Sequence, residues 1–544
     1  MNNNFKRLSA LTAALSLACV SMCSCADAEN YGSYSESYSS SQEYYEYNET
    51  DKWCADESSA AEEKEEIHDT SPNEEYKEYI ESGFKDPNAE PLSTFSADVD
   101  TASYSNVRRL IEDSQTIPEG AVRIEEFINY FDYDYPEPQN DEAFSSYIEL
   151  ADCPWDSTSK LMMIGLQGKT FEEDELPPSN LVFLIDSSGS MSSYNKLPLV
   201  QSAFSMLAEN LTEYDRISIV TYANSSSTLI KGADGSEKDD ILEALYSINA
   251  GGGTNGEGGI ETAYELAERY FIEGGNNRVI IATDGDLNIG ASSGDELVEL
   301  IESKRDNGIY LSVLGFGTDN IKDSRLEALA DNGNGNYSYI DSIEEAQRVL
   351  VREMSGTLHT IAKDVKIQVE FNPSQISSYR LIGYDNRIMD AHDFVDTTKD
   401  AGEVGAGHNV TALYEVKLAD TDGTYDGITL EFASEHKDTP EQLQAENSSR
   451  KELCKLSVAY KEPETEKNVT LSTLFGMEKY SESPSESIKL AGAVTEFAML
   501  LKNSQYKGNS SYKQILDVVE ELDTDNEKIS ELYALVKSAS ALYE

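Results

Sequence analysis

Five oxygen-bearing side chains in this 544-residue chain stand in an order that suits a metal site. Asp186, Ser188 and Ser190 follow one another at two-residue steps in the segment LVFLIDSSGSM. Thr254 follows a run of three glycines, and Asp284 closes the segment RVIIATD. Carboxylate and hydroxyl oxygens are hard ligands, and the set lacks sulfur and imidazole, so it favours Mg²⁺, Mn²⁺ or Ca²⁺ over zinc or copper. The five residues therefore predict a divalent-cation site.

A purely structural role is the alternative for each short segment taken alone. Serine and aspartate are common in turns and at helix N-termini, where Asp186 and Asp284 would cap the helices that follow. Either segment alone favours that interpretation, whereas all five residues in this order favour the metal site. Asp286 and Asn288 are candidates for groups that orient the ligands from behind. A simple turn explains these two residues equally well.

Two buried strands are expected to carry the acids to one place. Leu181–Ile185 and Arg278–Thr283 are short apolar runs, a pattern typical of strands covered on both faces in a parallel sheet. The acids begin at the carboxyl ends of these strands, where open α/β sheets place their ligands. The glycines before Thr254 let the backbone approach closely, so their loop could deliver Thr254 into the same crevice.

The region from Asn180 to about Leu358 alternates strand and helix patterns. This alternation predicts an α/β fold, a doubly wound and mostly parallel sheet with helices on both faces. The expected strands are Leu181–Ile185, Arg216–Tyr222, Arg278–Thr283, Tyr310–Gly315 and Tyr337–Ile340. The expected helices are Lys196–Leu211, Asp239–Ile248, Ile260–Phe271, Asp295–Arg305, Asp323–Ala330 and Ile343–Leu358.

Segments on both sides of this region alternate apolar and polar residues, as half-buried antiparallel strands do. They predict a β-sandwich in which the α/β region is an insertion. The stretch from Ser487 to Leu542 carries apolar faces at helical spacing and predicts three short helices. The strand candidates are Ser145–Leu150, Leu161–Gln167, Val365–Phe371, Arg380–Tyr384, Val410–Lys417, Ile428–Phe432 and Leu456–Tyr460.

The five candidate ligands resemble the metal-ion-dependent adhesion site (MIDAS) of von Willebrand factor A (VWA) domains, where D-x-S-x-S is followed by Thr and then Asp. The resemblance implies that Ser188, Ser190 and Thr254 contact the metal directly. It implies that Asp186 and Asp284 act largely through bound water. In such domains one coordination position stays open, and a carboxylate from another protein fills it.

Further segments resemble bacterial YfbK-type VWA proteins, and the similarity covers about Leu92 to the end of the chain. It implies a VWA domain flanked by two companion domains, and a surface lipoprotein character, and it supplies no reaction. The segments are Phe95–Ile111, Ala121–Pro138, Arg380–Arg387 and Val404–Val416.

These patterns together divide the chain into six expected parts. They are a lipoprotein-type signal peptide (1–25), a disordered acidic tether rich in Tyr, Ser and Glu (26–88), an N-terminal companion domain (89–176), the VWA domain (177–360), a β-rich companion domain (361–475) and a C-terminal helical segment (476–544).

The first residues carry the marks of a secretion signal. Lys6 and Arg7 precede the apolar stretch Leu8–Met22, which is too short for a stable membrane span. A small residue before a cysteine is typical of lipoprotein processing, which favours lipidation of Cys25 over Cys19 or Cys23. Ordinary cleavage after Ala26-Asp27-Ala28 is the alternative and would release a secreted protein. The expected location is therefore extracytoplasmic, at the cell membrane.

The net charge of −59 constrains the partners. The expected tether holds 19 acidic residues against 4 lysines, and its low aliphatic content favours disorder, apart from a short helix expected around Glu74–Ile80. Nucleic acid is a poor partner, because phosphate contacts need clusters of Lys and Arg. A protein that gives an Asp or Glu to the metal should otherwise present a basic or neutral surface.

Three cysteines remain beyond the leader, namely Cys54, Cys153 and Cys454, and their spacing matches no zinc pattern. A disulfide between Cys153 and Cys454 is one interpretation for an oxidising compartment. Two buried, unpaired thiols are an equally good one.

Three classes of function remain to be compared. A metal with an open position can activate water, but the chain has only 5 histidines, none of them in the metal loops, and it lacks a nucleophile elbow or phosphate loop. The sequence therefore favours a non-catalytic, metal-dependent protein-binding module of the adhesion type. A metal-independent accessory or scaffold protein of a cell-envelope complex is the alternative.

Overall fold

The computed structural model describes residues 67–139, 142–171, 176–285, 294–352, 359–419, 424–425, 428–429, 452–463, 465–523 and 525–544. The signal peptide, Cys19, Cys23, Cys25 and Cys54 lie outside these residues, as do Asp286 and Asn288. Within the described part, none of the helices combines the length and the apolar character that crossing a membrane requires.

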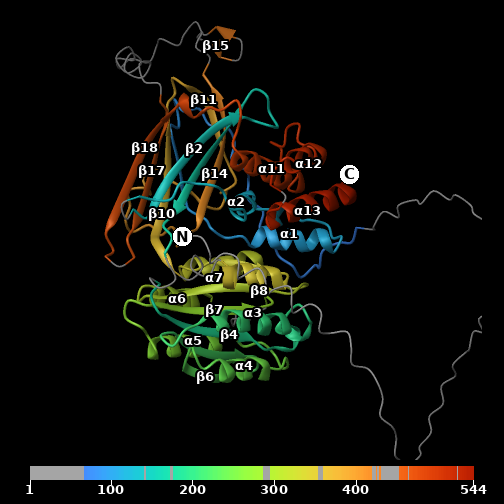
Figure 1. Cartoon of the computed structure of the whole chain (residues 1–544), viewed down its shortest axis with the longest axis vertical. Coiled ribbons are helices and arrows are strands. Elements are labelled where there is room, and N and C mark those ends of the chain that lie inside the picture. The colour runs from blue at the N-terminus through green and yellow to red at the C-terminus, as the bar shows by residue number, and fades with distance from the viewer. Residues whose placement is uncertain are drawn as a thin grey trace, which may run out of the picture. The chain divides into compact units, whose positions relative to one another are not determined.

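The α/β region forms one six-stranded sheet with the order β6-β5-β4-β7-β8-β9 (Figure 1). All neighbouring pairs are parallel except β5 with β6, which are antiparallel. Every residue of β4 and β7 is buried, as expected from their apolar sequences. The strands are β4 Ser179–Asp186, β5 Arg216–Tyr222, β6 Ser226–Asp234, β7 Asn276–Thr283, β8 Ile309–Phe316 and β9 Tyr337–Ile340.

Helices cover both faces of this sheet. On one face Phe183 of β4 packs in a core shared with α3, α4 and α8, and on the other face Leu184 packs in a core shared with α5, α6 and α7. Alternate residues of one strand thus bury into opposite cores, which is the doubly wound arrangement expected from the sequence. The helices are α3 Leu197–Asn210, α4 Lys238–Ser247, α5 Gly256–Arg269, α6 Gly294–Arg305, α7 Asp323–Asn332 and α8 Ile343–Gln347.

Two elements of this region differ from the sequence-based expectation. The edge strand β6 was not predicted, because its half-exposed residues do not form an apolar run. The helix predicted over 343–358 is shorter than expected, since α8 ends at Gln347 and a π-helical turn (η4, Arg348–Arg352) follows. Residues 353–358 lie outside the described residues.

Strands from both sides of the insertion build a β-sandwich around a shared core. One sheet has the order β12-β1-β10-β17-β18 with β13 beside β10, and the other has the order β11-β14-β3-β2. β3 pairs with β14 and β1 with β10, so the two expected companion domains contribute to the same two sheets. The strands are β1 Leu92–Ser96, β2 Phe144–Asp152, β3 Lys160–Gly168, β10 Thr360–Phe371, β11 Ile376–Ile382, β12 Ile388–Met389, β13 Gly402–Gly405, β14 Asn409–Leu418, β17 Glu452–Lys461 and β18 Asn468–Gly476; β15 Thr424–Tyr425 and β16 Ile428–Thr429 pair separately.

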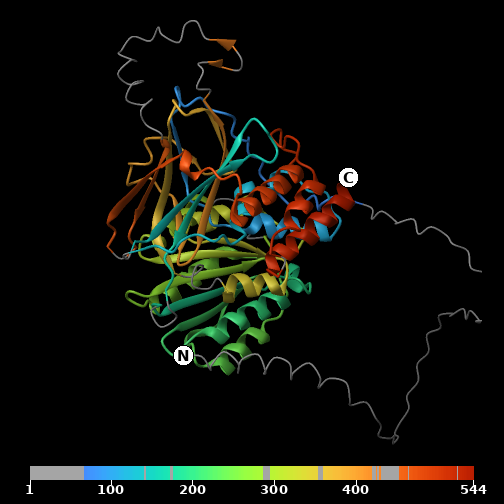
Figure 2. The ribbon, with the colours of Figure 1, turned by 45° about the horizontal axis from the view of Figure 1, so that its top comes forward.

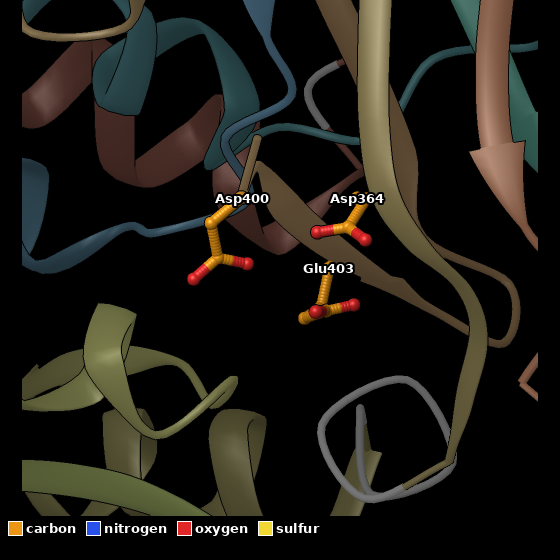
Figure 3. Close-up of side chains that lie close together, drawn as sticks. All are labelled: Asp364, Asp400 and Glu403. Atoms are coloured by element: carbon orange, nitrogen blue, oxygen red, sulfur yellow. The ribbon is translucent and has the colours of Figure 1, made fainter. Parts of the chain in front are cut away.

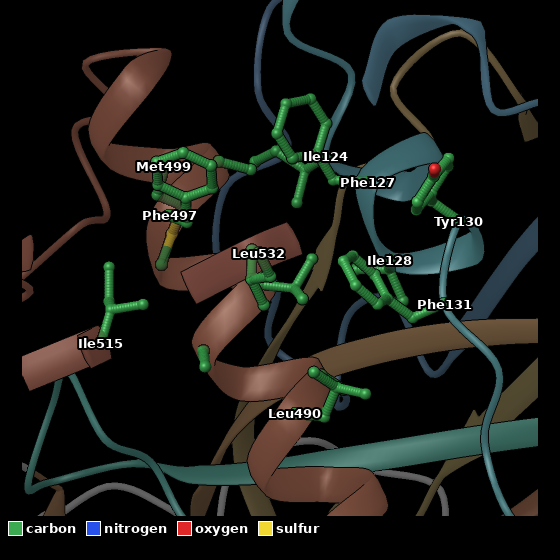
Figure 4. Close-up of a cluster of buried hydrophobic side chains, with 14 of the residues drawn as sticks. Ile124, Phe127, Ile128, Tyr130, Phe131, Leu490, Phe497, Met499, Ile515 and Leu532 are labelled. Carbon is green, nitrogen blue, oxygen red and sulfur yellow. The ribbon is translucent and has the colours of Figure 1, made fainter. Parts of the chain in front are cut away.

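The three predicted C-terminal helices are present: α11 Glu486–Leu501, α12 Tyr512–Val519 and α13 Glu527–Tyr543. They share one apolar core with two helices from near the start of the described chain, α1 Ala102–Glu112 and α2 Ile124–Asn129. Figure 4 shows Phe127 and Ile128 of α2 in this core with Leu532 of α13. In Figure 2 the red C-terminal helices again lie beside the blue α1 and α2.

The tether predicted over 26–88 ends earlier than expected, and the helix predicted over 74–80 is absent. Residues 67–90 run in extended and turn conformations, with backbone bridges that join His68 to Gln115, Glu75 to Lys322 and Lys85 to Tyr379. The Glu74 side chain is 1% exposed and pairs with Arg109 at 3.0 Å. These pairings give the backbone and the acid of this segment partners that an isolated acidic helix would lack.

Cys153 and Cys454 are buried, unpaired thiols. Cys153 lies in the helical core and Cys454 in the sandwich core, so they are not placed to form a disulfide. Burial raises the pKa of each thiol to about 12. Of the two interpretations left open by the sequence, the structure has the second.

A buried ion-pair network joins the α/β region to the helical core, and we call it the Arg108 junction. Arg108 of α1 pairs with Asp341 at 2.6 Å, with Glu345 of α8 at 3.0 Å and with Glu531 of α13 at 2.9 Å. Arg348 also pairs with Glu345. Although burial acts in the opposite direction, the two guanidinium groups lower the pKa of Glu345 to about 2. Every carboxylate in the junction therefore has a cationic partner.

Candidate metal centre

Asp186 and Asp284 reach the same edge of the sheet because β4 and β7 are neighbouring parallel strands. Asp186 is the last residue of β4, and Asp284 directly follows β7. Both acids are buried, with exposed fractions of 0% and 1%. The strand prediction thus accounts for the placement of the two acids that lie farthest apart in the candidate set.

The D-x-S-x-S segment folds into a tight turn at the end of β4. The backbone N–H of Ser188 donates to Asp186 Oδ1 at 2.8 Å, and the hydroxyl oxygens of Ser188 and Ser190 lie 2.9 Å apart. A 3₁₀ turn from Gly189 to Ser192 follows. Three of the five predicted oxygen ligands are therefore gathered in one turn.

The glycine-rich loop before Thr254 is fastened to this turn by its backbone. The Gly251 N–H donates to the Ser187 carbonyl at 2.8 Å, and the Gly189 N–H donates to the Gly252 carbonyl at 3.1 Å. Gly252 has φ of +91°, and a Cβ there would lie 2.7 Å from the Asn224 side-chain nitrogen, so glycine is required. The loop thus brings half-buried Thr254 beside the D-x-S-x-S turn.

Two carboxylate oxygens of the site have no hydrogen-bond donor among the described residues. Asp186 Oδ2 and Asp284 Oδ1 are both buried and unpartnered. Burial, together with the negative charge of Asp284, raises the pKa of Asp186 to about 6. Buried polar atoms in proteins are nearly always partnered, so these two oxygens indicate a missing positive charge. Together with the serine hydroxyls they form an all-oxygen donor set that fits a divalent cation.

Lys196 belongs to the site and was not among the predicted residues. Its ammonium nitrogen lies 2.9 Å from Asp284 Oδ2, and its side chain is 9% exposed. Lys196 immediately precedes α3, where the positive end of the helix macrodipole disfavours a cation. That local conflict is the sequence signal that marks Lys196 as held by an acid elsewhere.

A second acidic group, the acidic trio Asp364, Asp400 and Glu403, lies where the α/β region meets the sandwich (Figure 3). One carboxylate oxygen from each residue lies within 4.8 Å of the others. Arg305 of α6 pairs with Asp400 at 2.6 Å, and Lys461 of β17 pairs with Asp364. Burial and the neighbouring carboxylate of Asp364 raise the pKa of Asp400 to about 6. Because two of the acids already have cationic partners, we describe the trio as an interdomain contact.

Three family models match this chain. One described as von Willebrand factor type A domain matches residues 180–352, one described as von Willebrand factor matches residues 70–163, and one described as uncharacterized protein YfbK, C-terminal, matches residues 356–542. VWA domains are generally non-catalytic interaction modules. The first match spans the six-stranded sheet that carries the candidate metal site.

Known proteins extend this likeness. The chain is 40% identical over 447 residues to the uncharacterized protein YfbK of Escherichia coli, which covers 81% of this chain and 76% of that protein. It is similar to the solved von Willebrand factor type A protein from Catenulispora acidiphila, with a TM-score of 0.42 and 11% identity over 75% of this chain and 91% of that chain. It is also similar to proximal thread matrix protein 1 from the mussel byssus, solved with a zinc-occupied MIDAS motif, with a TM-score of 0.28 and 22% identity over 32% of this chain and 44% of that chain. Its identity to YfbK extends over most of both proteins, and on that ground this chain belongs to the YfbK family of VWA-domain proteins.

Proposed function

We propose that this chain is a divalent-metal-dependent protein-binding module of the adhesion type. A cation bound by Asp186, Ser188, Ser190, Thr254 and Asp284 accepts an acidic side chain from a partner protein. The observation that carries the proposal is the pair of buried, unpartnered oxygens on Asp186 and Asp284. Mg²⁺ is the expected ion, and Mn²⁺ or Ca²⁺ suits the same all-oxygen donor set.

The charge of the donor set explains why the partner should supply a carboxylate. Ser188, Ser190 and Thr254 are neutral ligands, so the cation keeps much of its positive charge. One of the two acids, Asp284, is already shared with Lys196. An incoming Asp or Glu gains a charge-assisted contact at a single point, and the surrounding loops then supply specificity.

We place the protein outside the cytoplasm, anchored to the cell membrane through a lipid on Cys25. The support is the N-terminal pattern of two basic residues, an apolar stretch and a cysteine after Ser24. A secreted form without an anchor is the alternative. The net charge of −59 favours a partner whose wider surface is basic or neutral and disfavours nucleic acid.

The proposal assigns no reaction to the site. A hydrolytic metal site needs a general base in reach of the metal-bound water. The metal-binding segments 186–190, 251–254 and 284–288 contain no histidine. The non-catalytic character of VWA domains in general supports the same conclusion.

The test is titration of the full chain with Mg²⁺, Mn²⁺ and Ca²⁺ by calorimetry, beside the variant Asp186→Ala. We expect saturable binding that the variant loses while its circular dichroism spectrum stays unchanged. Asp400→Ala is the matched control, because it removes a carboxylate from the acidic trio and leaves the candidate metal site intact. Equal binding by the wild type and Asp186→Ala would refute the proposed site.

The partner is then sought by affinity capture from envelope fractions with and without a chelator. Capture that needs the metal and weakens as salt is added supports metal-dependent, electrostatically steered binding. Capture that is indifferent to chelator and to Asp186→Ala would instead identify a metal-independent accessory or scaffold protein of an envelope complex.

A further inference from the structure

Lys196 is a buried lysine at the edge of the candidate metal site. It immediately precedes α3, and its backbone N–H donates to the Ser193 carbonyl while its own carbonyl accepts from Val200. From there the side chain reaches Asp284 Oδ2 at 2.9 Å. Asp284 is 0% exposed at this contact, so the ion pair lies beneath the surface of the crevice.

The β8–α7 loop holds the lysine side chain in this direction. Gly317 has φ of +77°, and a Cβ at that position would lie 2.4 Å from both Cγ and Cε of Lys196. The absence of a side chain at residue 317 therefore lets the methylene groups of Lys196 lie flat against the loop. The position of the ammonium group is set by three separate elements, α3, β7 and the β8–α7 loop.

The ion pair divides the two oxygens of Asp284 between different tasks. Oδ2 is occupied by Lys196, whereas Oδ1 is buried and has no partner among the described residues. Only Oδ1 is left to face a cation, directly or through water. Lys196 also cancels one of the two negative charges that Asp186 and Asp284 bring to the site.

We infer that Lys196 is a positioning residue that holds Asp284 by one oxygen and keeps the metal-loaded site net positive, so that it accepts a partner's carboxylate. This inference rests on the proposed function and assigns a task that the five expected ligands do not perform. Two carboxylates, one ammonium group and a divalent cation leave a net positive charge. Without the ammonium group the same site is neutral and attracts an acid less strongly.

The inference predicts opposite effects on the two binding steps. Lys196→Met removes a positive charge close to the cation, so cation affinity should rise on the order of tenfold. The same change should weaken carboxylate binding to the loaded site on the order of tenfold. Lys196→Arg keeps the charge and should leave carboxylate affinity within about threefold of the wild-type value.

The experiment uses the full chain with Mn²⁺ as the cation and acetate as the carboxylate. Electron paramagnetic resonance of free Mn²⁺ gives the cation affinity. Water-proton relaxation at saturating Mn²⁺ then reports acetate binding, because acetate displaces water from the bound ion. Lys238→Met is the matched control, since Lys238 is held by the carbonyls of Ala208 and Leu211 near the far end of α3.

Each outcome decides for or against the role of Lys196. Tighter Mn²⁺ and weaker acetate binding in Lys196→Met alone supports it. Weakening of both steps would indicate a merely structural lysine, strengthening of both would indicate a lysine that occupies the place of the cation, and no change would leave it without a role; each overturns the inference. Wild-type protein that binds no Mn²⁺ at a site dependent on Asp186 would instead refute the proposed function itself.

Discussion

The candidate metal site and the Arg108 junction both bury carboxylates on the same α/β sheet, with opposite results. At the junction Glu345 accepts from Arg108, Arg348 and Tyr130, and its pKa falls to about 2. At the metal site Asp186 keeps one buried oxygen without a partner, and its pKa rises to about 6. Burial is nearly complete in both places, so the partners make the difference.

The comparison separates two uses of a buried charge. The junction holds its own cations and so contributes to the attachment of α8 to α1 and α13 without outside help. The metal site holds Lys196 against Asp284 and is left one positive charge short. Buried acids that lack partners mark the region whose stability should respond to an added cation.

Removal of the guanidinium at the junction should have the largest effect. Arg108→Met leaves Asp341 and Glu345 buried with fewer partners, so the free energy of unfolding should fall by about 3–5 kcal/mol. Denaturant unfolding measures this change. Glu531→Gln is the matched control, because Glu531 is 36% exposed and should cost less than about 1 kcal/mol. Equal losses in the two variants would contradict a special role for the buried acids.

The opposite sign is expected at the metal site when metal is absent. Asp186→Asn removes a buried carboxylate whose pKa is raised to about 6, so the free energy of unfolding at pH 7.5 in chelator should rise by about 2 kcal/mol. With Mg²⁺ added, the wild type should gain stability and the variant should not. A variant less stable than the wild type in chelator would show that the Asp186 carboxylate already has a stabilising partner.

The pH dependence should carry the same signature. The pKa of Asp186 is higher in the folded chain than its ordinary value of 3.8, so the folded state binds more protons between about pH 4 and pH 6. Stability from this group is therefore greatest below pH 4 and is lost as the pH rises through 6. The stability difference between Asp186→Asn and wild type in chelator should grow over that window and stay level above it. A difference that is constant from pH 4 to pH 7 would contradict the raised pKa.

The acidic trio should give the smallest effect. Asp400 is 54% exposed and pairs with Arg305, so Asp400→Asn should change the free energy of unfolding by less than about 1 kcal/mol. Thermal unfolding of the variant beside the wild type measures it. A loss as large as that of Arg108→Met would place the trio with the junction, whereas stabilisation by added Mg²⁺ that needs Asp400 would place it with the metal site.

The sequence predicted the parts of the fold that follow from local patterns. The continuous apolar runs of β4 and β7 identified buried parallel strands, and the periodic apolar faces identified α11 to α13. The edge strand β6 was missed because half-exposed residues give no clear period. Extension of the folded part back to residue 67 was missed because its acids find partners such as Arg109 only in three dimensions.

The candidate site shows the same limit. Asp186, Ser188 and Ser190 are neighbours in the chain, and the two strands supply Asp284, so their approach follows from the order of residues. That these residues bind metal stays a prediction. Lys196 was missed because nothing in its own segment indicates the distant acid that it contacts. The acidic trio was missed for the same reason, since its members meet only when β10 and β13 pair.

The insertion of the α/β region has a consequence for the order in which the chain acquires its structure. β3 finds its partner β14 through pairs such as Leu166 with Val410, and β1 finds β10 through pairs such as Phe95 with Ile367. During synthesis β1, β2 and β3 emerge long before β10 begins at Thr360. Residues 179–352 contain all strands of their own sheet and so need no earlier partner. We expect them to fold first and bring the two halves of the sandwich together, which reduces the entropy cost of closing so long a loop.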